Sequence, residues 1–172
     1  MSLIRKRLLG LLVAAIVFVA DQGVKAWVTG PLGLDQVGDI REVLPIFALN
    51  FTPNFGVSLG MFTAGSTEGR WALVAMTAAI ALFVFVWLLR ERKLPEIAAL
   101  GLVLGGAIGN IRDRFTFGYV IDYADLHFGG WRPFLVFNLA DAAITIGVLI
   151  ILARSLLSRD KPETIASPAP ES

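Results

Sequence analysis

Cysteine is absent from this chain of 172 residues, and its single histidine is His127. The absence of cysteine excludes disulfides, thiol nucleophiles and thiolate metal sites. One histidine among scattered carboxylates matches no zinc spacing, so neither a metal nor a cofactor is expected. Charged residues make up only 17% of the chain and leave a net charge of +1. The net charge by itself indicates nothing about nucleic acid, and no nucleic-acid partner is expected.

Hydrophobic residues, in contrast, make up 56% of the sequence, and the mean hydropathy is +0.71. This composition predicts an all-α integral membrane protein with a single domain. A span needs about 20 apolar residues, and we predict four spans, at about 8–28, 71–89, 96–114 and 133–153. The domain is then 1–157, with outer loops 29–70 and 115–132 and a disordered, Pro- and Ser-rich cytoplasmic tail, 158–172.

The first span begins like a signal peptide, with basic residues before the apolar run Leu8–Ala20. Phe18, however, occupies a position where cleavage after Ala20 would need a small residue. We therefore expect the span to be retained. In the following loop, Val43–Thr52 alternates between apolar and polar residues, with Phe47, Leu49 and Phe51 on one face, which predicts a strand.

The basic residues predict the topology. Nine of them flank alternate span ends, near residues 5–7, 90–93 and 154–161, whereas five lie on the other side. Because basic residues concentrate in the cytoplasm, both termini are expected there. The two long loops, and the acids beside them, then face outward.

Two groups of residues near the outer boundary have a helical spacing. Asp21 and Lys25 are four positions apart, and form either an ion pair that offsets its own desolvation or a support that orients groups at the outer face. Asn110, Asp113 and Arg114 share a face of the third span. The same span carries glycines at every fourth position, which is typical of close helix packing; they are Gly101, Gly105 and Gly109.

Asp122 and Asp141 are the acids around which a function can be built. They lie 19 positions apart, beside or inside apolar runs, and carboxylates at such places are costly and usually functional. If the fourth helix begins at Pro133, Asp141 lies about 12 Å along it, one turn beyond Asn138.

Three functions are compatible with these residues. Asp122 and Asp141 could form an aspartic-protease pair, in which one acid activates water and the other is protonated. They could instead form the ion or proton site of a small membrane transporter, which four spans without an evident repeat make weaker. Ser58 with Lys25 or His127 could form a serine hydrolase, although His127, beside aromatic residues in a glycine-rich loop, is better explained by a place at the membrane surface.

Beyond these patterns, the chain resembles the bacterial lipoprotein signal peptidases, also called signal peptidase type II. The resemblance rests on the order and spacing of five motifs: Asp21-Gln22 with Lys25, Asn54-x-Gly56, Gly105-Gly106-x-x-Gly109-Asn110-x-x-Asp113-Arg114, Val120-Ile121-Asp122-Tyr123 and Phe137-Asn138-Leu139-Ala140-Asp141. The sequence departs from the family after Gly56, where Val57-Ser58-Leu59 replaces a pattern of small residues followed by Phe.

The resemblance implies an aspartic endopeptidase of the bacterial inner membrane, with four transmembrane helices and a small β-sheet cradle at the outer surface. Such an enzyme removes the signal peptide of diacylglyceryl-modified prolipoproteins just before the lipidated cysteine. Its implied partners are these substrates, membrane lipids and globomycin-type inhibitors, and we expect a monomer. The catalytic pair is implied at Asp122 and Asp141. The supporting or substrate-binding positions are implied at Asp21, Lys25, Asn54, Gly56, Gly106, Asn110, Asp113, Arg114, Asn138 and Ala140.

Overall fold

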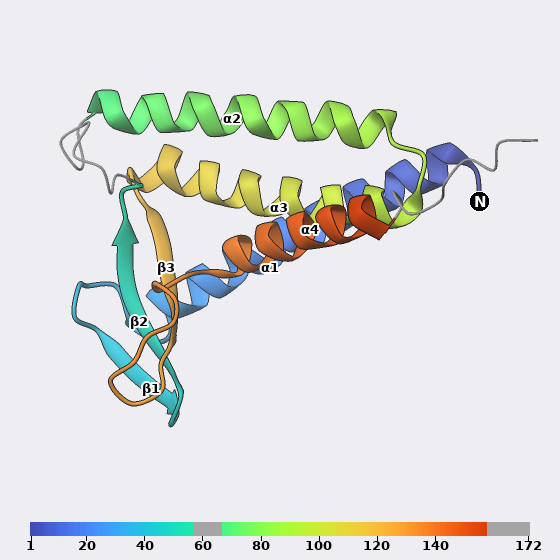
Figure 1. Cartoon of the computed structure of the whole chain (residues 1–172). Coiled ribbons are helices and arrows are strands. Elements are labelled where there is room, and N and C mark those ends of the chain that lie inside the picture. Colours follow the sequence, from blue (N-terminus) through green and yellow to red (C-terminus); the bar gives the residue numbers. More distant parts are fainter. Residues whose placement is uncertain (57–66, 158–172) are drawn as a thin grey trace, which may run out of the picture.

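The computed structural model describes residues 1–56 and 67–157 and shows four long helices with a small sheet at one end (Figure 1). The helices are α1 (Leu3–Thr29), α2 (Thr67–Arg90), α3 (Leu94–Phe117) and α4 (Leu139–Leu157). The strands are β1 (Ile40–Leu44), β2 (Phe47–Asn54) and β3 (Val120–Leu126). Within the described residues, α2, α3 and α4 are long and apolar enough to cross a membrane, judged by length and composition. The mostly helical fold is thus confirmed, and three of the four predicted spans correspond to helices that could cross a membrane.

The predicted start of the fourth helix at Pro133 is wrong, since α4 begins at Leu139. The preceding chain is held in extended form by the sheet. The backbone N–H of Phe137 donates to the carbonyl oxygen of Ala124 at 3.1 Å, and the N–H of Ala124 donates back to the carbonyl oxygen of Phe137 at 2.7 Å. A prolyl residue suits the first turn of a helix, but here these hydrogen bonds to β3 delay the helix by six residues.

Helix α3 is the centre of the bundle and contacts each of the other three helices. In Figure 1 it lies between α2 on one side and α1 with α4 on the other. A methyl group added at Gly101 or Gly105 would collide with a carbonyl oxygen of α1, and one added at Gly109 would lie 2.6 Å from a carboxylate oxygen of Asp21. The glycines therefore bring the backbones of α3 and α1 into direct contact, as the small-residue spacing predicted.

The sheet is antiparallel, in the order β1-β2-β3. The single predicted strand Val43–Thr52 is in fact split between β1 and β2 by a tight turn after Leu44. Leu49 and Phe51 of β2 are buried, as the alternation predicted, and pack with Ile121 of β3 and Val28 of α1. This cluster fixes the sheet on the end of α1.

The other end of the bundle gathers the basic segments. The Lys6 ammonium donates to the carbonyl oxygen of Arg92 at 3.0 Å, and Arg154 pairs with Glu96 at 2.7 Å. The start of α1, the α2–α3 connection and the end of α4 therefore lie together, at the end opposite the sheet (Figure 1).

Gly105→Ala is expected to destabilise the bundle, because the added methyl group collides with the Ala14 carbonyl and pushes α3 away from α1. Overpacking of this kind costs about 1–3 kcal/mol. Gly23→Ala in α1 is the matched control, since no atom lies within 4 Å of its added methyl group. Equal midpoints of thermal unfolding for the two variants in detergent would contradict the close α1–α3 contact.

Candidate active site

Asp122 lies in the middle of β3, where its side chain is only 2% exposed. Both carboxylate oxygens accept hydrogen bonds from amide side chains. The Asn138 amide donates to Oδ1 at 2.6 Å, and the Asn54 amide donates to Oδ2 at 2.9 Å. The Asn54 amide is itself oriented, since its oxygen accepts from the backbone N–H of Gly56 at 2.8 Å.

Asp141 lies in the first turn of α4, not 12 Å along it as predicted. It forms a reciprocal cap with Asn138. The Asn138 side-chain oxygen accepts from the Asp141 N–H at 2.9 Å, and the Asp141 Oδ2 accepts from the Asn138 N–H at 3.3 Å. This is the arrangement of a capping box, built here from Asn and Asp. The other oxygen of Asp141 accepts from the amide of Asn110 at 2.8 Å.

Asn138 therefore touches both acids and brings them together. Its amide nitrogen faces Asp122, while its oxygen and backbone N–H face Asp141. Burial is the main cause that raises the pKa of Asp122 to about 7, and the nearby charge of Asp141 acts in the same direction. The hydrogen bonds from Asn54 and Asn138 oppose this shift because they favour the ionised form. At neutral pH, Asp122 is poised to hold or release a proton.

Lys25 forms the centre of a second, buried set of charges below the acids. Lys25 as a whole is only 2% exposed. Its ammonium lies 2.8 Å from a carboxylate oxygen of Asp21 and 2.7 Å from one of Asp113, and it donates to the side-chain oxygen of Asn110 at 3.2 Å. Two explanations were given for the Asp21–Lys25 spacing. The geometry favours a support that orients groups at the outer face, since a snorkelling lysine would reach solvent.

The two carboxylates of this set extend to the segments that carry the candidate acids. Asp21 accepts from the backbone N–H of Ala140 at 3.0 Å, and Asp113 accepts from the backbone N–H of Ile121 at 3.3 Å. Each hydrogen bond is made to the residue directly before one of the acids. The Lys25 set therefore fixes the backbone positions from which Asp122 and Asp141 project.

Close backbone approach completes the site. A methyl group at Gly106 would lie 2.5 Å from the carbonyl oxygen of Ala140, so the missing side chain lets α3 and α4 meet beside Asp141. Gly56 has a φ of +76°, which disfavours other residues, and the space beside it is occupied by the guanidinium of Arg114. The Arg114 Nε is buried and has no hydrogen-bond partner among the described residues.

Several polar residues of this region were missed from the sequence. The Gln22 amide donates to Asp21 at 3.0 Å and to Asp113 at 3.1 Å, and its oxygen accepts from Arg112. Its position next to Asp21 was the available signal. On the sheet, Asp125 is buried and accepts from Arg132 at 3.1 Å, and no spacing in the sequence indicated this pair.

The residues of the serine-hydrolase alternative are not brought together in the described structure. Lys25 is already engaged by Asp21 and Asp113. His127 belongs to the sheet end, where its Nδ1 lies 4.0 Å from a carboxylate oxygen of Asp125. Ser58 lies outside the described residues. The geometry thus favours the acids over a serine as the chemical centre.

Comparison with known proteins identifies the family of the chain. Residues 13–157 match the family described as Signal peptidase (SPase) II. The chain belongs to the signal peptidase II family. Lipoprotein signal peptidase of Rhizorhabdus wittichii is 54% identical over 90% of this chain and 89% of the relative, and that of Sphingopyxis alaskensis is 50% identical over 88% and 87%. The family recognised from the motifs is thereby confirmed.

Two solved structures share the fold of this chain. A bacterial membrane enzyme determined by the in meso method at 1.9 Å resolution is 28% identical, with a TM-score of 0.73 over 88% of this chain and 94% of the other. A second such enzyme, at 2.3 Å resolution, is 26% identical, with a TM-score of 0.71 over 92% and 94%. This chain therefore shares the fold of two bacterial membrane enzymes over about nine-tenths of its length.

Asn54→Ala is expected to raise the pKa of Asp122 above about 7, because it removes a hydrogen bond that favours the ionised carboxylate. The pKa can be followed by the ¹³C chemical shift of labelled aspartate carboxyls as pH is varied. Asn50→Ala is the matched control on the same strand, since the Asn50 amide donates to Asp125 instead. A lower pKa, or an equal shift in the control, would contradict the role given to Asn54.

Proposed function

We propose that this chain is an aspartic endopeptidase that cleaves the signal peptide of diacylglyceryl-modified prolipoproteins just before the lipidated cysteine, with Asp122 and Asp141 as the catalytic pair. The single observation that carries the proposal is that Asn138 bonds both carboxylates, one in β3 and one at the start of α4. The names of the relatives, lipoprotein signal peptidases, support the substrate class.

The different environments of the acids divide the work between them. Asp141 lies at the positive end of α4, which favours a negative charge, whereas the raised pKa of Asp122 favours its protonated form. Asp141 then takes a proton from water as the water oxygen attacks the scissile carbonyl carbon. Asp122 donates a hydrogen bond to the carbonyl oxygen, where negative charge develops. When the C–N bond breaks, the proton held by Asp141 passes to the leaving amine.

The supporting residues act on this chemistry through position. Asn54, Asn110 and Asn138 orient the carboxylates, while Lys25 and its two acids hold the backbone beneath them. Arg114 has a buried, unpartnered Nε within the described residues. Its guanidinium is suited to bind a carbonyl oxygen of the substrate beside the scissile bond.

The proposed placement is the bacterial inner membrane, with one domain at 1–157, four spans including α1, and both termini in the cytoplasm. The gathering of basic segments at the end opposite the sheet supports this orientation (Figure 1). The tail 158–172 then lies in the cytoplasm, and the acids lie at the outer face. We propose a monomer, in contact with membrane lipids and open to globomycin-type inhibitors.

Asp122→Asn and Asp141→Asn are each expected to keep the fold and substrate binding but to lose cleavage by at least the ~10²–10⁴ typical of a lost acid or base. The double variant should be little worse than either single one, because the two groups act as a unit. The measurement is the cleavage of a purified lipidated prolipoprotein by each variant in detergent.

Asp35→Asn, in an exposed loop, is the matched control and should cleave at the wild-type rate. Ser58→Ala and His127→Ala should also retain substantial cleavage. Turnover within a few fold of wild type for either variant of the pair would end the aspartic proposal and return the transporter alternative to consideration.

Thr67→Cys and Lys93→Cys, each the only cysteine of its variant, are expected to react with an impermeant maleimide from opposite sides of the membrane. Both positions are exposed: Thr67 is the first residue of α2, and Lys93 lies in the connection that follows the other end of α2. Thr67→Cys should be labelled in spheroplasts and Lys93→Cys in inverted vesicles. Labelling of both from the same side would refute the proposed topology.

A further inference from the structure

An apolar groove opens directly beside Asp141. It has a volume of about 330 Å³ and is lined by Phe134 and Leu135 of the segment before α4 and by Ala142, Thr145 and Ile146 of its first turns. Asp141 is the one charged residue in this lining. We call this feature the α4 groove.

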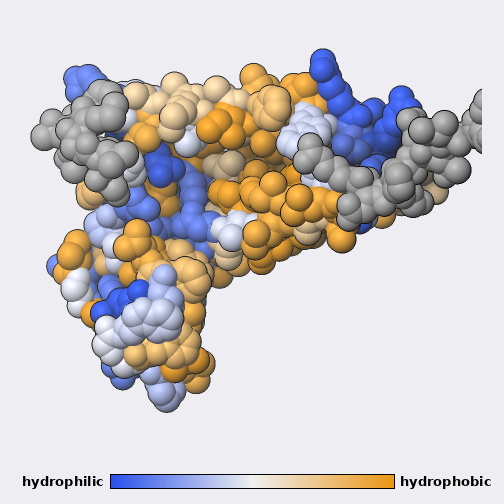
Figure 2. Space-filling view, in the orientation of Figure 1, coloured by the Kyte–Doolittle hydropathy of each residue, from blue (hydrophilic) through white to orange (hydrophobic). Residues whose placement is uncertain are grey.

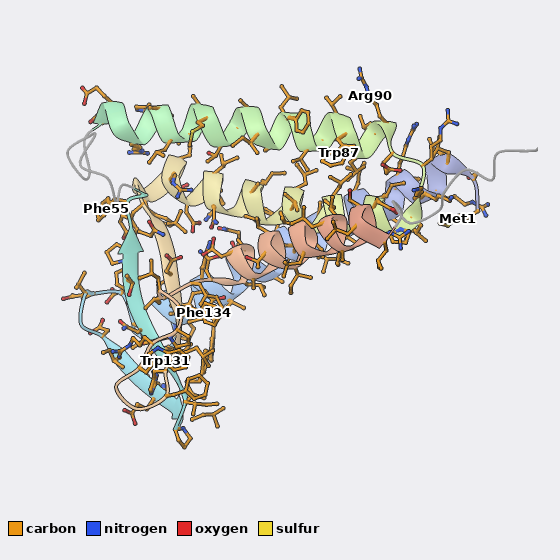
Figure 3. All side chains as sticks on the ribbon, in the orientation of Figure 1. Met1, Phe55, Trp87, Arg90, Trp131 and Phe134 are labelled. Carbon is orange, nitrogen blue, oxygen red and sulfur yellow. The ribbon has the colours of Figure 1, made fainter. Side chains whose placement is uncertain are left out.

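The α4 groove continues into the exposed apolar face of the helix. Leu135 is 89% exposed and Ile146 is 52% exposed, and the exposed Leu149 follows Ile146 one turn further along. Figure 2 shows this hydrophobic surface of α4 next to a hydrophilic band between the helices and the sheet. Figure 3 shows Phe134 between the sheet and the start of α4. A continuous apolar path therefore leads from Asp141 to the side of the bundle that would face lipid.

We propose that the α4 groove holds an acyl chain of the substrate's diacylglyceryl group. This inference rests on the proposed function, in which the lipidated cysteine directly follows the scissile bond. A substrate with its scissile carbonyl at Asp141 has its lipid within one residue of that point. The groove begins at Asp141 and ends in the membrane-facing surface, as a long chain attached there requires.

The shape of the α4 groove distinguishes an acyl chain from a signal-peptide side chain. A short side chain needs an enclosed pocket, and it would leave the open, lipid-facing part of this groove empty. An acyl chain can enter sideways from the bilayer and remain in apolar surroundings throughout. Ile146 and Leu135, which both line the groove, then contact the chain beyond the scissile bond.

The groove would act by positioning the substrate relative to Asp141, not by removing the acyl chain from water. Lipid tails are as apolar as the groove, so moving a chain from the bilayer into it releases little hydrophobic free energy. A chain held in the groove does, however, fix the cysteine relative to Asp141, and small misplacements of reacting groups lower rates strongly. We therefore expect the groove to discriminate between long and short chains in kcat/KM.

The test compares two synthetic substrates that share one signal peptide and differ in the lipid on cysteine, dipalmitoyl or dibutyryl glycerol. Cleavage is measured in phospholipid vesicles, and the readout is the ratio of kcat/KM for the long-chain to the short-chain substrate. Wild type should prefer the long chains. Ile146→Trp fills the groove and should lower the ratio by at least about tenfold, since a misplacement of 1 Å can cost about 10²-fold in rate.

Leu149→Trp, on the same exposed face but outside the groove lining, is the matched control and should leave the ratio unchanged. Leu135→Asp is a second test that does not disturb packing, because the residue is 89% exposed, and it should lower the ratio as Ile146→Trp does. An unchanged ratio in both groove variants, or an equal loss on both substrates, overturns the proposal, and the latter result assigns the groove to the signal peptide. If wild type cleaves neither substrate, the proposed function itself fails, whereas normal wild-type cleavage with an insensitive ratio rejects only the groove.

Discussion

One buried ammonium, that of Lys25, determines how the rest of the site is arranged. It pairs with Asp21 on its own helix and with Asp113 on α3. The charges are removed from water, so their mutual attraction must offset a desolvation penalty of several kcal/mol per ion. Buried ion pairs of this kind are a weak source of stability, and replacement by apolar residues is often tolerated. The buried charges of Lys25, Asp21 and Asp113 are better explained by the further hydrogen bonds that the two carboxylates accept.

These hydrogen bonds fix the two segments that carry Asp122 and Asp141 relative to α1 and α3. Asp21 holds the N–H of Ala140, and Asp113 holds the N–H of Ile121. The geometry requires the helix backbones to be very close, and Gly109, whose added methyl would lie 2.6 Å from Asp21, provides that proximity. The buried charges therefore depend on the glycines of α3, because with a side chain at Gly109 the Asp21 carboxylate would have no room beside this helix.

Much of this arrangement could be predicted from the sequence, because it depends on local spacing. The glycines at every fourth residue predicted the close contact of α3 with α1, the Asp21–Lys25 spacing indicated an ion pair, and the apolar runs predicted four helices. The start of α4 was predicted at Pro133 because a proline suits the first turn of a helix, whereas Asn138 and Asp141 cap the helix six residues later. Bonds between Phe137 and β3 compete with helix formation there, and no local pattern shows such a contact. The same holds for the roles of Gln22 and Asp125, whose partners lie on other elements.

The cap of α4 also explains why the two aspartates have different electrostatic surroundings. Asp141 is tied to the start of a helix, where the peptide dipoles and the N–H of Asn138 stabilise negative charge. Asp122 is placed by a strand that is buried on both faces, and burial outweighs the hydrogen bonds of Asn54 and Asn138. General acid–base chemistry at neutral pH is served by a carboxyl group with a raised pKa, as burial gives Asp122. The different surroundings of the two acids arise from secondary structure, since Asp141 lies in the first turn of a helix and Asp122 lies within a sheet, and Asn138 bonds both.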